Sequence, residues 1–313
     1  MAKYKKIKVK TVEEWLEIRR PRLGGSEIAS VIHINPWESR YELYLRKRGE
    51  APDKEENDTM LLGHLMEDVV AQLLQKKLGI QIIKNTSGNL IYLSEDYPFA
   101  EASPDRLGYP ADVKKSEDNK IIVEIKTTQK TIDEEDIPAH WICQVMWYMG
   151  ITGYTKALIA WLTQGRTFGY KWIDFDQGFF NMLAEEGRQF MEDVKNGNTP
   201  EAVTAADVAS RYPTHTPDKQ IEVNESVALA CEKYKELKKQ IKDIEAELEP
   251  VEEMIKVAIK DAESITYGGL TLATYKASKD SLKFDKKLFE SENPELLQKY
   301  TKLVPGGRRL NVK

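Results

Sequence analysis

A short apolar run, residues 121–125, constrains the fold of this chain more than any other segment. Its sequence is IIVEI, and an apolar run of this length rich in β-branched residues predicts a buried β-strand. Glu124 interrupts the run, and a carboxylate is an unusual residue in a buried strand. Because side chains alternate along a strand, Glu124 shares one face with Lys126. The sequence therefore predicts a sheet with a carboxylate and a lysine on one face.

On both sides of this strand, the spacing of apolar residues indicates further helices and strands. Residues 11 to about 80 are expected to form four helices. The first helix starts at Thr11, and the other three cover residues 27–32, 41–48 and 63–78. Strands are expected at 81–84, 90–93, 121–125, 157–162 and 167–173, and further helices at 138–149 and 175–197. This order predicts an α/β fold in which helices flank a central sheet of mixed pairing.

Residues 223–262 carry the most regular period in the sequence. Apolar residues recur there in steps of four and three: Ala230, Tyr234, Leu237, Ile241, Ile244, Leu248, Val251, Ile255 and Ala258. Such a pattern predicts a long helix with a heptad seam, as in a coiled coil, over about four heptads. Pro250 is expected to kink or interrupt the helix.

The remaining boundaries follow from these segments. Residues 1–205 are expected to form the larger domain, and the proline-containing stretch 206–222 a linker. Residues 263–313 are expected to form a small α+β subdomain that ends the chain.

Composition excludes several classes of protein. The 313 residues are 41% hydrophobic and 31% charged, which is typical of a globular chain, and the apolar runs are shorter than the roughly 18 residues of a membrane span. A net charge of −5 excludes a uniformly basic nucleic-acid coat but leaves room for a local basic groove. Cys143 and Cys231 are far apart and predict no disulfide framework, and no secretory signal follows the basic start. A reducing cytoplasm is the expected compartment.

A first candidate site combines Ser103-Pro104-Asp105 with Glu124 and Lys126. Two converging carboxylates repel each other unless a cation lies between them, and Mg²⁺ prefers such oxygen ligands. Lys126 can hold the attacking water or stabilise charge on a phosphate, which suits hydrolysis of a phosphodiester. The alternative is structural: an aspartate in a surface loop, and a solvent-facing Glu–Lys ion pair on a strand.

Three further features have both a functional and a structural interpretation. Glu67 lies early in the helix at 63–78, where it can act at a catalytic site or compensate the helix dipole. Gln144 lies in an apolar helix, where it can hold a metal-bound water or satisfy a backbone group. Arg19, near two further arginines, precedes Gly24-Gly25-Ser26, and together they form either an anion site or an ordinary helix start.

Five segments, in this order, resemble one family: GGSEIASVIHINPWESRYELYLRKRGE, GHLMEDVVAQLL, ASPDRLG, VEIKTT and QVMWYMGITG. They resemble the phage-type exonucleases of the YqaJ and lambda-exonuclease family, also called alkaline exonucleases, over about residues 11–200. The resemblance implies a restriction-endonuclease-like, PD-(D/E)XK core with a mixed central sheet. It also implies 5′–3′ digestion of linear duplex DNA in phage recombination, which leaves 3′ single strands for an annealing protein in the bacterial cytoplasm.

The same resemblance implies a metal site. Asp105, Glu124 and the backbone carbonyl of Ile125 would bind Mg²⁺ or Mn²⁺, and Lys126 would position the attacking water. Glu67 would lie near a second ion or the nucleophile, so two ions are expected.

It further implies a phosphate site and an assembly. Gln144 would lie near the reacting groups, and Arg19 with Ser26 would hold the 5′-terminal phosphate. Arg106 departs from the family, in which many members have glycine at this position. Lambda-type members form ring-shaped trimers, so a homo-oligomer is expected.

Other functions are compatible with the sequence. A structure-specific endonuclease of the same fold would use the same carboxylates, and a catalytically silent subunit would bind DNA or act as a scaffold. A third alternative is an interaction protein whose first domain supports the seam at 223–262.

The segment FDKKLFESENPELLQKYTK also resembles the C-terminal extension of YqaJ-type proteins.

Overall fold

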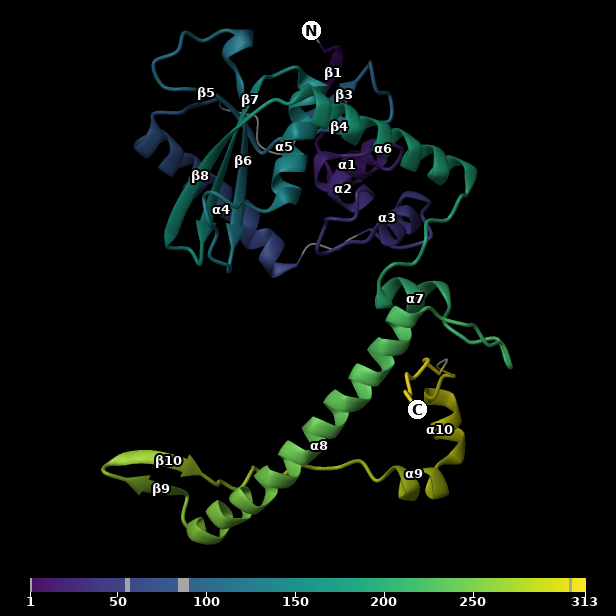
Figure 1. The fold of residues 1–313 in the computed structure, drawn as a ribbon. Helices are drawn as coiled ribbons and strands as arrows, with labels where there is room; N and C mark the ends of the chain where they lie inside the picture. The colour runs from purple at the N-terminus through teal and green to yellow at the C-terminus, as the bar shows by residue number, and fades with distance from the viewer. Residues whose placement is uncertain (1, 54–56, 84–89, 304–305) are drawn as a thin grey trace. The chain divides into compact units, whose positions relative to one another are not determined.

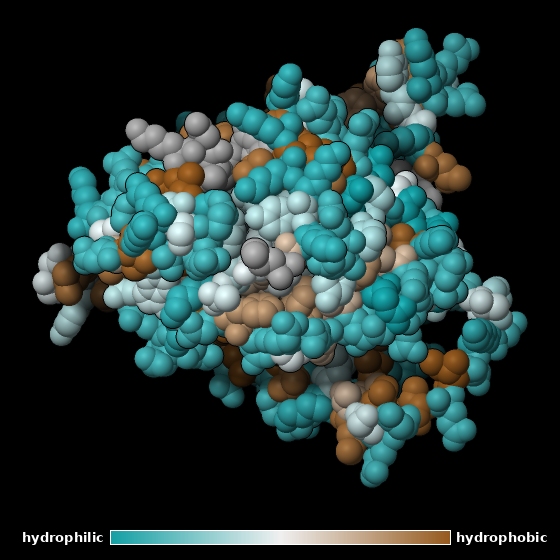
Figure 2. Space-filling view, turned by 90° about the horizontal axis from the view of Figure 1, so that it is seen from above, coloured by the Kyte–Doolittle hydropathy of each residue, from teal (hydrophilic) through white to brown (hydrophobic). Residues whose placement is uncertain are grey.

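The computed structural model describes residues 2–53, 57–83, 90–303 and 306–313. It divides into two compact units, Met1–Arg211 and Tyr212–Lys313, which Figure 1 draws as one ribbon. Within the described residues, no helix is long and apolar enough to cross a membrane. The face shown in Figure 2 is mainly hydrophilic, with its hydrophobic residues in separate groups.

The first unit is built around a five-stranded sheet in the order β2-β5-β6-β7-β8. Its strands are β2 (Gln81–Ile82), β5 (Arg106–Tyr109), β6 (Ile121–Thr128), β7 (Lys156–Thr163) and β8 (Thr167–Asp174). Strands β6 and β7 pair in parallel and the other pairs are antiparallel, so the mixed sheet expected from the sequence is confirmed. Residue 84, the end of the strand expected at 81–84, lies outside the described residues.

A second, three-stranded antiparallel sheet contains β1 (Tyr4–Lys8), β3 (Leu90–Ser94) and β4 (Glu101–Ala102). Strand β1 was not expected, because its lysine-rich sequence has the character of a solvated terminus. The ring of Tyr4 packs edge-on against Tyr92, with 5.3 Å between the ring centroids. The basic side chains of β1 are exposed while its backbone pairs with β3.

Helices cover both faces of the central sheet (Figure 1). One face packs on α5 (Ala139–Thr152), on which α2 (Gly25–Val31) and α6 (Gln177–Asn196) pack in turn, and the other face packs on α4 (Asp58–Leu78). Alternation along β6 divides the core accordingly, since Ile122 joins the α5 side while Val123 and Ile125 join the α4 side. Glu124 therefore projects toward α5.

Helix α4 differs from expectation at its start and in its buried face. The side chain of Asn57 caps it by accepting a hydrogen bond from the amide of Met60, so the helix begins before residue 63. Its buried residues are Val70, Ala71 and Leu74. The helical spacing of Leu65, Val69, Leu73 and Leu74 predicts that they share one apolar face, but Leu65 and Val69 are exposed.

Three smaller helices complete the first unit: α1 (Val12–Arg19), α3 (Arg40–Lys47) and α7 (Ala205–Arg211). Asp207 of α7 is buried and accepts a hydrogen bond of 2.6 Å from the Ser39 hydroxyl at the start of α3. This contact extends the first unit beyond residue 205 into the stretch expected to be a linker.

The second unit contains α8 (Glu225–Ile259), a hairpin of β9 (Ser264–Tyr267) and β10 (Leu270–Thr274), and the short helices α9 (Lys286–Glu292) and α10 (Pro294–Tyr300). Helix α8 is not interrupted at Pro250. The large apolar residues of the expected seam are all exposed: Tyr234, Leu237, Ile241, Ile244, Leu248, Val251 and Ile255.

The close packing of α5 on α6 gives a test of this core. A Cβ at Gly150 of α5 would overlap the buried ring of Phe180. We expect Gly150→Ala to lower the free energy of unfolding by about 1–3 kcal/mol, as overpacking does. The matched control is Gly63→Ala in α4, where an added Cβ has Thr127 Oγ1 as its nearest neighbour at 3.6 Å. The control should be neutral or stabilising in urea unfolding; equal stability of Gly150→Ala and the native chain would contradict the packing.

Candidate active site

Glu124, in the middle of β6, is 1% exposed and is held by two neighbours. Its Oε1 accepts hydrogen bonds from Lys126 Nζ at 2.7 Å and from Gln144 Nε2 at 2.6 Å. Its Oε2 is buried and has no hydrogen-bond partner among the described residues. Burial raises the pKa of Glu124 to about 8, and the charge of Asp105 adds to this effect. One carboxylate oxygen is therefore fixed while the other is left for a ligand.

Asp105 lies just before β5 and is tied directly to β6. Its Oδ2 accepts a hydrogen bond of 2.7 Å from the backbone amide of Ile125. Desolvation raises the pKa of Asp105, although Lys126 opposes the shift. The structure thus brings Asp105 beside Glu124, as the sequence pattern predicted.

Lys126 and Gln144 link β6 to α5. Lys126 Nζ also donates to Gln144 Oε1 at 2.9 Å, and Gln144 Nε2 donates to the hydroxyl of Tyr148 at 3.0 Å. Burial lowers the pKa of Lys126, but Glu124 and Asp105 outweigh burial and raise it above its ordinary value. Lys126 is therefore a charged hydrogen-bond donor at neutral pH.

Glu67 pairs with Arg106 rather than with Lys126 or Gln144. Its Oε2 accepts a hydrogen bond of 2.8 Å from Arg106, whose other terminal nitrogen lies 2.9 Å from Asp68 Oδ1. Desolvation and the charge of Asp105 raise the pKa of Glu67, while Arg106 lowers it. In the described part of the chain, no three His, Cys, Asp or Glu side chains are arranged to hold a metal ion.

The chemistry of the donor set still suits a hard cation. Mg²⁺ is commonly bound through one or two carboxylates and keeps several waters. Asp105 and the unpartnered Oε2 of Glu124 supply two such carboxylates, and the Ile125 carbonyl follows on the same strand. These three groups, with Glu67 outside the set, are the residues that could hold an ion.

Arg19 and Ser26 meet where α1 ends and α2 begins. Arg19 NH2 lies 3.3 Å from Ser26 Oγ, and Arg19 Nε lies 3.2 Å from Glu101 Oε1. The Arg19 guanidinium also lies over the ring of Trp15, 4.1 Å from its centroid. A Cβ at Gly24 would overlap Arg19 and Glu101, so this approach requires glycine.

A buried carboxylate, Glu27, holds Arg19 in this arrangement. It pairs with three cations: Lys47 at 2.8 Å, Arg46 at 3.0 Å and Arg19 at 3.7 Å. Burial alone would raise the pKa of Glu27, but the three cations outweigh it and hold the pKa far below its ordinary value. Glu101, Arg46 and Lys47 were not identified from the sequence, because these pairs join different elements and leave no periodic signal.

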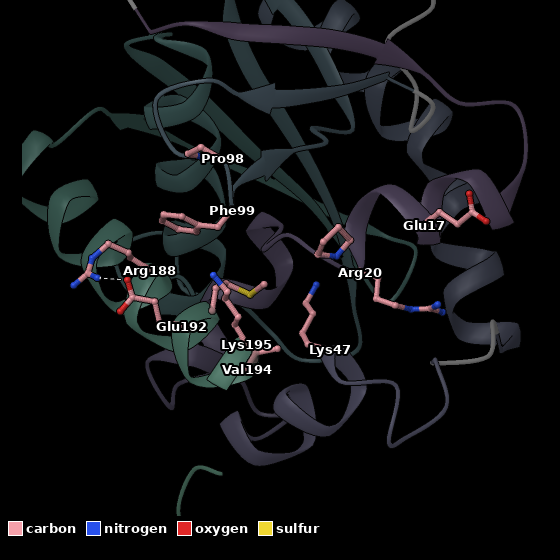
Figure 3. A pocket seen from close by; sticks show the side chains of 11 residues that line it. Glu17, Arg20, Lys47, Pro98, Phe99, Arg188, Glu192, Val194 and Lys195 are labelled. Carbon is pink, nitrogen blue, oxygen red and sulfur yellow. Dashed lines mark hydrogen bonds and ion pairs between the residues drawn. The ribbon is translucent and has the colours of Figure 1, made fainter. Parts of the chain in front are cut away.

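Residues of both clusters line one cavity of about 460 Å³, to which the first cluster contributes Lys126 and Gln144 rather than its carboxylates. Its walls include Arg19, Ser26, Lys126 and Gln144, together with the aromatic side chains of Trp15, Trp37, His140 and Trp141. A larger cavity of about 690 Å³, shown in Figure 3, is lined by other residues such as Phe99, Arg188 and Lys195. Because Lys126, Gln144, Arg19 and Ser26 line the smaller cavity and not the larger one, we assign the candidate active site to the smaller cavity.

The Glu27 pairs predict how stability depends on pH. A carboxyl group whose pKa is depressed on folding stabilises the protein above its unfolded pKa of about 4.5, and this stability is lost as the pH falls below that value. We expect Glu27→Gln to lower the free energy of unfolding at pH 7 by about 3–5 kcal/mol. The loss should shrink between pH 4.5 and pH 3, as measured by urea unfolding.

A control variant separates this effect from a general loss of charge. Glu201→Gln removes a carboxylate at an exposed position and should follow the native curve at each pH. If the stability of Glu27→Gln also followed the native curve at each pH, the ion pairs would contribute nothing to stability.

Comparison with known proteins finds a family model that matches part of the chain. Residues 14–155 match the YqaJ-like viral recombinase domain. The uncharacterized protein YqaJ of Bacillus subtilis (strain 168) is 28% identical over 305 residues, which cover 93% of this chain and 91% of that protein.

Solved structures also resemble this chain. An alkaline exonuclease from Laribacter hongkongensis is 20% identical with a TM-score of 0.47, over 59% of this chain and 94% of its own. A phage-related exonuclease from Haemophilus somnus 129PT is 10% identical with a TM-score of 0.37, over 56% and 96%. The family resemblance inferred from the five sequence segments is confirmed by the domain match, and the chain carries a YqaJ-like viral recombinase domain over residues 14–155.

Proposed function

We propose that this protein is a metal-dependent exonuclease that digests linear duplex DNA from its 5′ ends during phage or prophage recombination. The observation that carries the proposal is the shared cavity. It is lined by Lys126 and Gln144, which hold Glu124, and by Arg19 and Ser26, which would bind a phosphate. A phosphate-binding site next to a hydrolytic site suits an enzyme that starts from a phosphorylated end. Aromatic rings of the same cavity suit stacking on bases.

Each group would have a distinct part in hydrolysis. Asp105, Glu124 and the Ile125 carbonyl would hold Mg²⁺ or Mn²⁺ in a restriction-endonuclease-like core. The ion would supply Lewis acidity toward the scissile phosphate. Lys126, charged and held by Gln144, would orient the attacking water or stabilise the charge that develops on the phosphate.

The anion site would fix the register of the substrate. Arg19 offers a guanidinium and Ser26 a hydroxyl, and such groups bind phosphate well at a helix start. A 5′-terminal phosphate bound there would present the first phosphodiester to the carboxylates. This anchoring favours an exonuclease over an endonuclease of the same fold.

The wider role belongs to the same proposal and rests on the family resemblance. The products would be 3′ single strands for an annealing protein, in the cytoplasm of a bacterial host. The chain would act as a homo-oligomer, with a trimer as the first expectation. The exposed apolar residues of the heptad seam on α8 support association with another chain.

The first test concerns Lys126. We expect the native chain to degrade 5′-phosphorylated linear duplex DNA with Mg²⁺ or Mn²⁺ and not with EDTA, while an intact circle survives. Lys126→Ala should lower kcat by at least about 100-fold, because a charged donor to the reacting phosphate is lost. Lys156→Ala, which removes an exposed lysine of the neighbouring strand, should keep native activity.

Two results would contradict the proposal. Cutting of the intact circle would identify an endonuclease instead. A lack of digestion with every metal, in a chain with a native circular dichroism spectrum, would favour a silent DNA-binding or scaffold subunit.

The second test concerns the 5′ phosphate. We expect the native chain to degrade 5′-phosphorylated ends faster than 5′-hydroxyl ends. Arg19→Ala and the milder Ser26→Ala should each reduce this preference, by about tenfold for Arg19, because a charged hydrogen bond to phosphate is lost. Rates on the two ends, measured separately, give the ratio.

Arg188→Ala is the matched control for the choice of cavity. Arg188 lines the larger cavity of Figure 3, where it pairs with Glu192. Arg188→Ala should leave the preference for 5′-phosphorylated ends unchanged. A preference that depended on Arg188 and not on Arg19 would move the phosphate site to the larger cavity.

A further inference from the structure

Arg106 follows Asp105 directly and is only 6% exposed. Its NH1 donates to Glu67 Oε2 at 2.8 Å and to the backbone carbonyl of Asp105 at 2.6 Å, and its NH2 donates to Asp68 Oδ1 at 2.9 Å. Three acceptors from α4 and the start of β5 therefore fix the guanidinium. An arginine held in this way is a permanent cation next to the carboxylates.

The position of this cation changes how Glu67 can act. The Oε2 of Glu67 accepts a charged hydrogen bond from Arg106, which weakens it as a metal ligand. A divalent ion placed beside Glu67 would also face the guanidinium at short range, and like charges in a half-buried site repel strongly. Three hydrogen bonds oppose a movement of Arg106 away from such an ion.

Formal charges lead to the same conclusion. With all four ionised, Glu67, Asp68, Asp105 and Glu124 carry −4, and Arg106 with Lys126 carries +2, which leaves −2. One divalent ion neutralises this sum. A second ion would leave +2 around partly buried groups, which is costly.

We propose that Arg106 takes the place of a second metal ion beside Glu67, so that the site binds a single divalent cation. Asp105 and Glu124 hold this ion, and Glu67 is a positioning residue that keeps Arg106 in place. The inference rests on the proposed function, because it assumes that Asp105 and Glu124 bind a metal.

Counting bound ions tests the inference without any measurement of activity. The full chain, stripped with EDTA and free of DNA, is titrated with Mn²⁺, and bound Mn²⁺ is counted by calorimetry and by electron paramagnetic resonance. We expect one ion per chain, which Asp105→Asn removes. Glu67→Gln should leave one ion with its Kd changed less than about threefold, because Glu67 is not a ligand.

Removing the guanidinium should create the second site. Arg106→Ala frees Glu67, and we expect two ions per chain. Arg166→Ala, which removes an exposed arginine in the turn between β7 and β8, should keep one. Circular dichroism shows whether Arg106→Ala is folded. If it is not folded, the numbers of ions bound by the native chain and by Glu67→Gln decide whether the site holds one ion.

The possible outcomes separate this inference from the proposed function. Two ions in the native chain, a tenfold weaker Kd in Glu67→Gln, or one ion in a folded Arg106→Ala would each overturn the role of Arg106 and leave a metal-dependent nuclease. No bound ion under any condition would overturn the metal-dependent function itself.

Discussion

The carboxylate of Glu124 is the group on which the rest of the site depends. A buried charge is tolerated only when it is paired and hydrogen-bonded, and Lys126 and Gln144 satisfy one of its oxygens. The other oxygen is unsatisfied among the described residues, at a cost of about 1–3 kcal/mol. A bound cation would offset that cost. The same pairing fixes the orientation of α5 on β6, since Gln144 belongs to the helix and Glu124 to the strand.

Tyr148 contacts both the carboxylate cluster and the start of α2. Its hydroxyl accepts from Gln144, which belongs to the carboxylate cluster. Its ring packs on Gly25, where no Cβ would fit, at the start of the helix that carries Ser26. A displacement of α5 would therefore disturb Ser26 and the carboxylates together. In the proposed function, the distance between a 5′ phosphate and the reacting groups would depend on this contact.

Much of this arrangement could be predicted from local pattern. Alternation along residues 121–128 placed Glu124 and Lys126 on one face, and the apolar helix at 138–149 marked Gln144 as its polar exception. Strand β1 could not be predicted, because its stability comes from pairing with β3 rather than from its own apolar residues. The exposed side of α4 was misjudged, since several apolar residues lie around that helix and only contact with the sheet selects a face.

Ion pairs between distant elements were the least predictable part of the site, and they decide its chemistry. Arg106 and Glu67 lie 39 positions apart, and Arg19 and Glu101 are farther apart still. Neither pair follows a helical or strand period. Both pairs nevertheless determine which carboxylates are free: Glu67 and Glu101 are each neutralised by an arginine, whereas Glu124 keeps an open oxygen. In the single-ion site that we propose, contacts with arginines, and not the motif alone, would decide which carboxylates bind the metal.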